Sequence, residues 1–169
     1  MRDILTLTVL IAVPATVAAI GCNSSPGLTV TGNVDIDANG TPTGFVFEQP
    51  ARLDGAAPNG AITGSCTLTS APAQSAYGIV VDLYGPSAAE GRALRSITIM
   101  TRTDAPANGT IEADLGADTF RGTCTVDTPL VTADGRVSLH TEGCSIEGAG
   151  ETATVALDLT FERCTVQTR

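Results

Sequence analysis

The chain has no lysine and no tryptophan, and it has one histidine among its 169 residues. Aromatic residues make up only 4% of the sequence, so stacked aromatic platforms for bases or sugars are not expected. Nine arginines stand against 18 acidic residues, which gives a net charge of −9. A chain this acidic is repelled by nucleic acid and by anionic lipid headgroups. We therefore expect no nucleic-acid partner.

The N-terminal segment has the features of a secretory leader peptide. A charged start, Met1-Arg2-Asp3, precedes the apolar run from Ile4 to Ile20, and small residues follow. This order is typical of a secretory signal. The run lies at the lower limit of the ~17–25 residues that span a bilayer as a helix, and Pro14 weakens a helix there. We interpret residues 1–21 as a signal peptide and not as a retained membrane span.

The end of this leader, Ala19-Ile20-Gly21-Cys22, resembles the lipobox of bacterial lipoproteins. The resemblance implies cleavage before Cys22 and attachment of diacylglycerol and fatty acids such as palmitate to its thiol. Asn23 after the cysteine resembles the class that Gram-negative bacteria sort to the outer membrane. The alternative is an ordinary cut after Ala19, which would release a soluble secreted protein.

Cysteine parity favours the lipoprotein interpretation. Acylation of Cys22 leaves an even set of four thiols in an oxidising compartment, Cys66, Cys124, Cys144 and Cys164. The ordinary cut would leave one odd thiol. Residues 22–27 form a short polar tether that reaches less than ~20 Å when extended. We therefore expect a single domain, residues 28–169, held close to the membrane of the cell envelope, on a periplasmic or a surface face.

Apolar and polar residues alternate with period two along almost the whole domain, which is typical of half-buried strands. Turn signals such as Asn39-Gly40, Asp134-Gly135 and Gly148-Ala149-Gly150 separate the runs. The pattern predicts an all-β fold, an antiparallel β-sandwich of eight or nine strands, with a small closed β-barrel as the alternative.

The strand pattern also predicts the disulfides. A hairpin over Asp134-Gly135 would pair Leu130 with Leu139, and a hairpin over residues 148–150 would place Val155 opposite Cys144. The inward-facing positions change from odd to even residue numbers between Thr141 and Cys144. This change predicts a bulge at residues 142–143, which brings Cys144 beside Cys124. Cys164 then lies roughly 30 Å further along its strand, beyond disulfide reach. We predict Cys124–Cys144 and Cys66–Cys164.

Two constellations suggest chemistry. Asp35, Asp37 and Asn39, followed by a glycine, match the first half of a calcium loop, but Val46 stands where the closing glutamate belongs. A hairpin turn is the competing interpretation, so calcium is the one cofactor that we consider and no other is expected. No CxxC pair or histidine cluster indicates zinc.

The second constellation is Ser138, His140 and Glu142, which share one face of a strand and superficially resemble a hydrolase triad. Neighbours at this spacing are about 6.6 Å apart along a strand, and no nucleophile-elbow motif is present. A solvated polar face is the competing interpretation.

The sequence supports three functional hypotheses. The first is a cell-envelope lipoprotein whose domain is a non-catalytic structural or interaction module, with other envelope proteins and the membrane as partners. The second is a carrier of a lipid or apolar ligand inside a barrel cavity. The third is a hydrolase that uses His140. One histidine and no nucleophile or cofactor motif favour the first, which is not an enzyme.

Overall fold

The computed structural model describes residues 27–53, 62–70, 76–85 and 92–168. No helix in these ranges is long and apolar enough to cross a membrane. One short 3-10 helix, η1 (Pro106–Asn108), precedes a strand. The described strands are β1 (Thr29–Ala38), β2 (Thr41–Arg52), β3 (Thr63–Ser70), β4 (Tyr77–Tyr84), β5 (Leu94–Arg102), β6 (Gly109–Leu115), β7 (Asp118–Cys124), β8 (Asp127–Val131), β9 (Val137–Gly148), β10 (Glu151–Glu162) and β11 (Thr165–Thr168).

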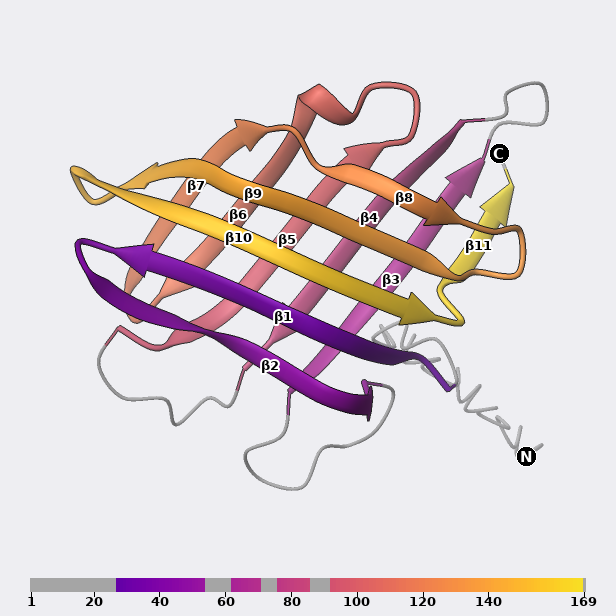
Figure 1. The fold of residues 1–169 in the computed structure, drawn as a ribbon, viewed down its shortest axis with the longest axis horizontal. Helices are drawn as coiled ribbons and strands as arrows, with labels where there is room; N and C mark the ends of the chain where they lie inside the picture. The colour runs from indigo at the N-terminus through magenta and orange to yellow at the C-terminus, as the bar shows by residue number, and fades with distance from the viewer. Residues whose placement is uncertain (1–26, 54–61, 71–75, 86–91, 169) are drawn as a thin grey trace, which may run out of the picture.

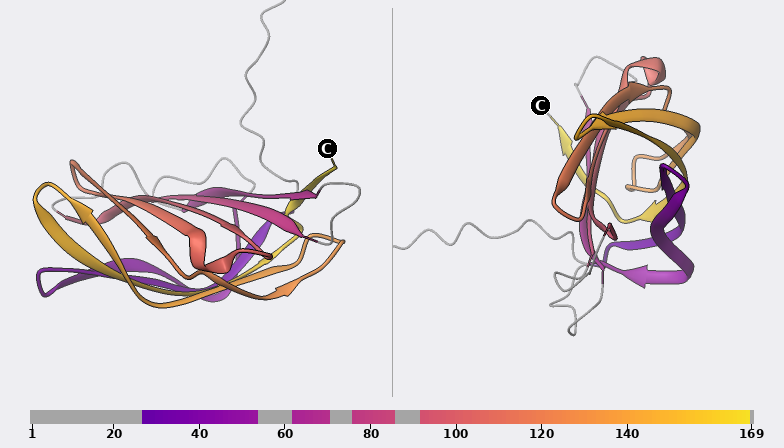
Figure 2. Two further views of the ribbon diagram at one scale, coloured as in Figure 1. Left: turned by 90° about the horizontal axis from the view of Figure 1, so that it is seen from above. Right: turned by 90° about the vertical axis from the view of Figure 1, so that its left-hand side faces the viewer.

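These strands form one curled sheet in the order β11-β3-β4-β5-β6-β7-β9-β10-β1-β2, and β8 pairs with β9 outside this path. β1, β2, β8, β9 and β10 lie in one layer, and β3 to β7 cross behind them in the other (Figures 1 and 2). The all-β, sandwich-like fold that the sequence predicts is confirmed. Among the described strands β2 and β11 are the two ends of the sheet, so the sheet curls without closing into a barrel.

Two features of the sheet differ from the sequence prediction. The described residues contain eleven strands and not eight or nine, because β8 and β11 are short and lack a clear apolar alternation. β11 also runs parallel to β3, whereas the other neighbouring strands are antiparallel. The chain leaves the end of β10 in one layer and enters β11 beside β3 in the other (Figure 1).

The core lies between the two layers and consists of the inward side chains of the alternating strands. One hydrophobic cluster joins residues of both layers, including Phe120 on β7 and Phe161 on β10, which are almost fully buried. The two buried threonines bond to backbone carbonyls: Thr141 donates to Thr125 at 2.7 Å and Thr101 to Val126 at 3.3 Å.

The β1–β2 hairpin has its turn at the predicted Asn39-Gly40, and β9 and β10 have the predicted register. Asn39 and Gly40 both have positive φ, 55° and 76°, as a type I′ turn requires, and Ala38 pairs with Thr41 across it. Val155 lies opposite Cys144 as predicted, and the register of β9 and β10 shifts between Val155 and Leu157. This shift is the bulge that the sequence places at residues 142–143.

The predicted register of β8 and β9 is wrong by one residue. Leu130 pairs with Ser138 and not with Leu139. The turn has three residues and not two: the N–H of Thr132 bonds to the carbonyl of Arg136 at 2.9 Å, and Gly135 takes a φ of 89° inside it. A three-residue loop that ends in a left-handed glycine is a common hairpin form, and the sequence alone does not distinguish it from a two-residue loop.

The four described cysteines form two disulfides, Cys66–Cys164 and Cys124–Cys144, which is the predicted pairing. Their Cα atoms are 4.7 Å and 5.6 Å apart, within the range of a relaxed disulfide. The Cys124–Cys144 bond joins β7 to β9, where the sheet passes from one layer to the other. The Cys66–Cys164 bond joins β3 to the segment between β10 and β11, at the opposite side of the curl.

An ion pair also connects the two layers. Both terminal nitrogens of Arg92, just before β5, contact the Glu151 carboxylate at the start of β10, at 2.7 Å and 3.1 Å. The hydrogen bonds from Arg92 hold the pKa of Glu151 below its ordinary value of 4.5. Because the pKa is lowered in the folded state, this contribution to stability is complete above pH 4.5 and is lost as the pH falls through the folded-state pKa.

We therefore expect Glu151→Gln to lower the melting temperature slightly near neutral pH, where an exposed pair contributes little. The difference from the unchanged protein should shrink steadily as the pH falls below the ordinary glutamate value, because protonation removes the same interaction. Thermal unfolding measured across acidic to neutral pH tests this, with Glu48→Gln on the exposed face of β2 as the control. A difference that does not depend on pH would contradict the assignment.

Candidate functional site

The predicted anchoring site lies outside the described residues. Cys22 and the segment Ala19 to Gly21 belong to a part of the chain that the structure does not describe, so acylation of Cys22 stays a prediction. The described chain begins at Gly27, five residues later, and passes directly into β1.

The calcium candidate lies on the β1–β2 hairpin. Asp35 and Asp37 are exposed on β1, and Asn39 is the first residue of the turn. The N–H of Gly40 donates to Asp37 Oδ1 at 2.7 Å, and the Asn33 side-chain amide donates to the Asp35 carboxylate. No three acidic, histidine or cysteine side chains in the described ranges are grouped so that they could hold a metal ion. The structure therefore shows a capped hairpin turn at this position.

The hydrolase candidates share a face of β9 but do not form a triad. The Ser138 hydroxyl lies 2.9 Å from the Thr160 hydroxyl on β10, and not within hydrogen-bond distance of His140. His140 Nε2 lies 3.5 Å from Glu142 Oε1, and the Glu142 side chain is 88% exposed. An activated serine needs a base bonded to its hydroxyl. The Ser138 hydroxyl therefore lacks the bonded base that an activated serine requires.

A depression of about 460 Å³ lies at the end of the sandwich where the described chain begins. Gly27 and Thr29 come from the start of β1, Arg52 from the end of β2, and Glu162 and Arg163 from the end of β10. β1 lies between the other two strands, and Thr29 pairs with both Arg52 and Glu162. The site therefore assembles where three neighbouring strand ends meet, although its residues are far apart in the sequence.

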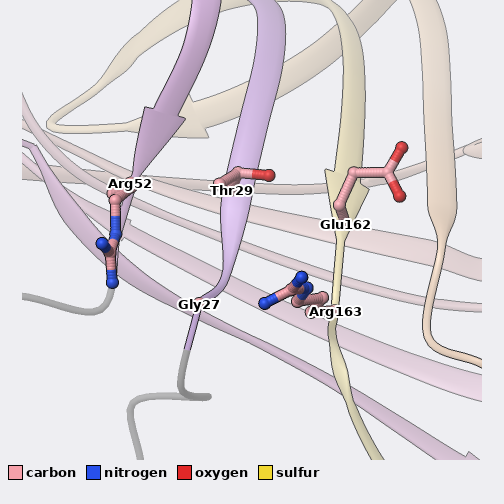
Figure 3. Close-up of a pocket in the computed structure, with 5 residues that line it drawn as sticks. All are labelled: Gly27, Thr29, Arg52, Glu162 and Arg163. Carbon is pink, nitrogen blue, oxygen red and sulfur yellow. The ribbon is translucent and has the colours of Figure 1, made fainter.

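The two arginines flank the first described residue. The guanidinium of Arg163 is turned toward Gly27, Arg52 lies on the other side of Gly27, and the carboxylate of Glu162 points away from this gap (Figure 3). A side chain at Gly27 would meet Arg163 directly, because an added Cβ would lie 2.7 Å from Arg163 Nη1. The close approach of Arg163 thus depends on glycine at position 27, where φ is 79°.

The charges around the depression are unevenly matched. Arg136, at the start of β9, forms an ion pair with Glu162, with Nε 2.9 Å from Oε1. Arg163 forms no ion pair or hydrogen bond with another residue in the described ranges. Among the described residues that line the depression, Glu162 is the acidic one, and its carboxylate is already paired with Arg136. Two guanidinium groups beside one opening can hold an anion.

The backbone at Arg163 is in an unfavourable conformation. Its φ is 66°, in the left-handed region that a long side chain rarely adopts. The next residue is fixed on two sides, by the disulfide to Cys66 and by the hydrogen bond from Cys164 N–H to the Gly135 carbonyl at 2.8 Å. The turn from β10 toward β11 therefore imposes this conformation. Strained residues of this kind are often retained at binding sites.

We expect Arg163→Gly to stabilise the fold by about 0.5–1 kcal/mol. Glycine removes the left-handed penalty of about 1–2 kcal/mol but loses about 0.5–1 kcal/mol through greater freedom of the unfolded chain. Urea unfolding of the two proteins measures the difference. Arg163→Ala is the control, because it removes the same side chain but retains the strained backbone, and it should not stabilise. Equal effects of glycine and alanine would show that the backbone conformation is not the cause.

No local sequence motif marks this site. Arg163 follows an unbroken alternation from Ala153 to Phe161, and the only signal is that an arginine stands between the end of this run and Cys164. The approach of Arg52 and Gly27 depends on the order of β2, β1 and β10 in the sheet. That order is not contained in any local motif.

In comparisons with known proteins, no family model, curated protein or solved structure matches the chain.

Proposed function

We propose that the chain is a bacterial cell-envelope lipoprotein that is held by acyl chains on Cys22. Its β domain serves as a non-catalytic structural or interaction module. The observation that carries the proposal is the state of the other cysteines. Cys66, Cys124, Cys144 and Cys164 are consumed by two disulfides, which leaves Cys22 as the single cysteine for acylation. The disulfides also suit an oxidising compartment outside the cytoplasm.

The proposed partners are the membrane, through the N-terminal lipid, and other envelope proteins. One acyl chain gives only weak attachment, whereas the two or three chains of a lipoprotein cysteine anchor it durably. Asn23 supports residence in the outer membrane. The outer face of β1, β9 and β10 carries exposed acidic side chains, among them Asp35, Asp158 and Glu147, which favours a polar or basic protein partner over an anionic one.

We expect Cys22→Ser to move the protein from the membrane fraction to the soluble fraction, because the acyl attachment point is lost. Fractionation of cells that express each form measures this change. Intact and peptide mass spectrometry of the membrane-derived protein should show a diacylglyceryl group on an N-terminal Cys22. Ser24→Ala is the matched control, because it changes a neighbouring residue of the same tether but leaves the anchoring cysteine.

An unmodified N-terminus near Ile20 in the native protein would contradict the proposal. That result would indicate cleavage after Ala19, with Cys22 as an odd thiol in a soluble secreted protein. A search for a disulfide-linked dimer through Cys22 would then replace the search for envelope partners.

A further inference from the structure

The arginines are distributed unevenly over the described surface. Arg92, Arg102 and Arg121 lie away from the depression and each is paired with a carboxylate, on Glu151, Asp104 and Glu112 respectively. Arg52, Arg136 and Arg163 lie together where β1 begins and β2 and β10 end. Among the described residues these three form an arginine cluster, whereas Arg95 lies apart from them and donates to the Gly116 carbonyl.

We infer that the depression between Arg52 and Arg163 binds the headgroup of an anionic phospholipid in the membrane that anchors the protein. Guanidinium groups bind phosphate oxygens through paired hydrogen bonds, and two of them flank one opening here (Figure 3). The inference deepens the proposed function and rests on it, because the lipid on Cys22 is what places this end of the domain at the membrane.

The distance along the chain supports a lipid headgroup as the ligand. Gly27 is five positions after Cys22 in the sequence, and such a segment reaches less than ~20 Å even when extended. Gly27 itself lines the depression. An acylated Cys22 would therefore keep the depression within one short tether of the headgroup layer. A soluble anion would have no such preference for this end of the domain.

The net charge of −9 does not prevent this contact. At physiological ionic strength, charges more than about 8 Å apart in water are largely screened. The Glu162 carboxylate that lines the depression is paired with Arg136 and points away from the gap. An approaching headgroup would therefore meet mainly the two guanidinium groups, while the acidic face of β1, β9 and β10 stays exposed to the aqueous phase and to partners.

The conformation of Arg163 gives independent support for a role of its side chain. Glycine or asparagine would adopt the φ of 66° at lower cost than arginine does. Arginine at this position therefore lowers stability, and its guanidinium forms no ion pair within the described ranges to compensate. Binding of a phosphate group is an interaction that would offset this cost.

Flotation with lipid vesicles tests the inference. The protein begins at residue 22 and carries Cys22→Ser, so no acyl chain contributes to binding. Every contact described above lies within residues 27–168, so this chain retains all of them. Vesicles of phosphatidylcholine alone are compared with vesicles that also contain phosphatidylglycerol, at low and at physiological salt. We expect binding to the mixed vesicles only, and weaker binding as the salt concentration rises.

Substitutions assign the binding to the depression. Arg163→Asn removes the charge while suiting the left-handed backbone, and it should weaken vesicle binding about fivefold, the effect of one basic residue at an anionic surface. Arg163→Lys retains the charge and should preserve most of the binding. Arg121→Gln, on β7 and outside the arginine cluster, is the matched control and should have no effect. Thermal unfolding of each variant verifies that it is folded.

Three results would overturn the inference: equal binding to both kinds of vesicle, equal loss with Arg121→Gln and Arg163→Asn, or binding of inorganic phosphate alone with no vesicle binding. The last result would identify a site for a free anion. The proposed function fails on a different measurement, the absence of an acyl group on Cys22 in the native protein. The two failures can therefore be told apart.

Discussion

Removal of the Cys66–Cys164 disulfide is expected to lower the free energy of unfolding by about 4–5 kcal/mol. The two cysteines are 98 residues apart in the sequence. Their bond therefore restricts most of the unfolded domain, and the chain-entropy estimate grows with the length of the closed loop. Cys66 is fully buried and Cys164 nearly so, so alanine replaces both without exposing a new polar group. The expected fall in melting temperature is on the order of 10–20 °C.

The second disulfide is the matched control. Cys124 and Cys144 are 20 residues apart, and the same estimate gives about 3 kcal/mol for their bond. Urea unfolding of the two double-alanine variants, at neutral pH and without reductant, compares them directly. The larger loss should belong to Cys66→Ala with Cys164→Ala. A larger loss from the 124–144 pair would show that local packing between β7 and β9, and not loop length, determines the contribution of the disulfides.

The fold class and the disulfide pairing could be predicted because both follow from the period-two pattern. In β10 the residues from Ala153 to Phe161 alternate without a break, so the inward face is unambiguous. The turn residues then fix which positions of β9 and β10 are opposite each other. Once Val155 is placed opposite Cys144, the length of β10 separates Cys164 from the other pair. The geometry of the β9–β10 hairpin was therefore sufficient to predict which cysteines form disulfides.

The register of β8 with β9 and the pairing of β11 with β3 depend on contacts between segments that are distant in the sequence. The register of β8 and β9 is set by a turn in which the Gly135 carbonyl also accepts the N–H of Cys164. A Cβ at Gly135 would overlap the backbone carbonyl of Cys164. Glycine at position 135 therefore also allows the close approach of Cys164, a requirement that the local Asp134-Gly135 turn signal does not contain. The parallel pairing of β11 with β3 likewise depends on where the chain crosses between the layers.

The candidate sites likewise show that local motifs do not predict which residues meet in the fold. Asp35 with Asp37 and Ser138 with His140 are close in the sequence, and alternate residues of one strand share a face without converging on a common point. In the described structure Asp37 caps the β1–β2 turn, and the Ser138 hydroxyl contacts Thr160 instead of His140. The depression has no motif, because Gly27, Arg52 and Arg163 come together only through the neighbouring positions of β1, β2 and β10.

Gly32→Ala is expected to destabilise the domain by more than about 4 kcal/mol, which is exceptional for the addition of one methyl group. Gly32 lies in the middle of β1 between β2 and β10 and has a φ of 111°. Alanine would incur the cost of about 1–2 kcal/mol for this conformation. Its Cβ would also overlap the backbone carbonyl of Asp158 on β10, where no side chain can rotate away. The strands would have to separate, and hydrogen bonds between β1 and β10 would be lost.

Gly40→Ala separates the two contributions. Gly40 has a φ of 76° in the β1–β2 turn, and an added Cβ there meets no atom within 4 Å. Alanine at this position incurs only the conformational cost, so we expect a loss of about 1–2 kcal/mol. Urea unfolding monitored by far-ultraviolet circular dichroism compares the two variants. If the losses were equal, β1 and β10 would have to move apart at Gly32 at little cost. The sheet would then tolerate a wider spacing between β1 and β10, which their pairing along ten residues of β1 argues against.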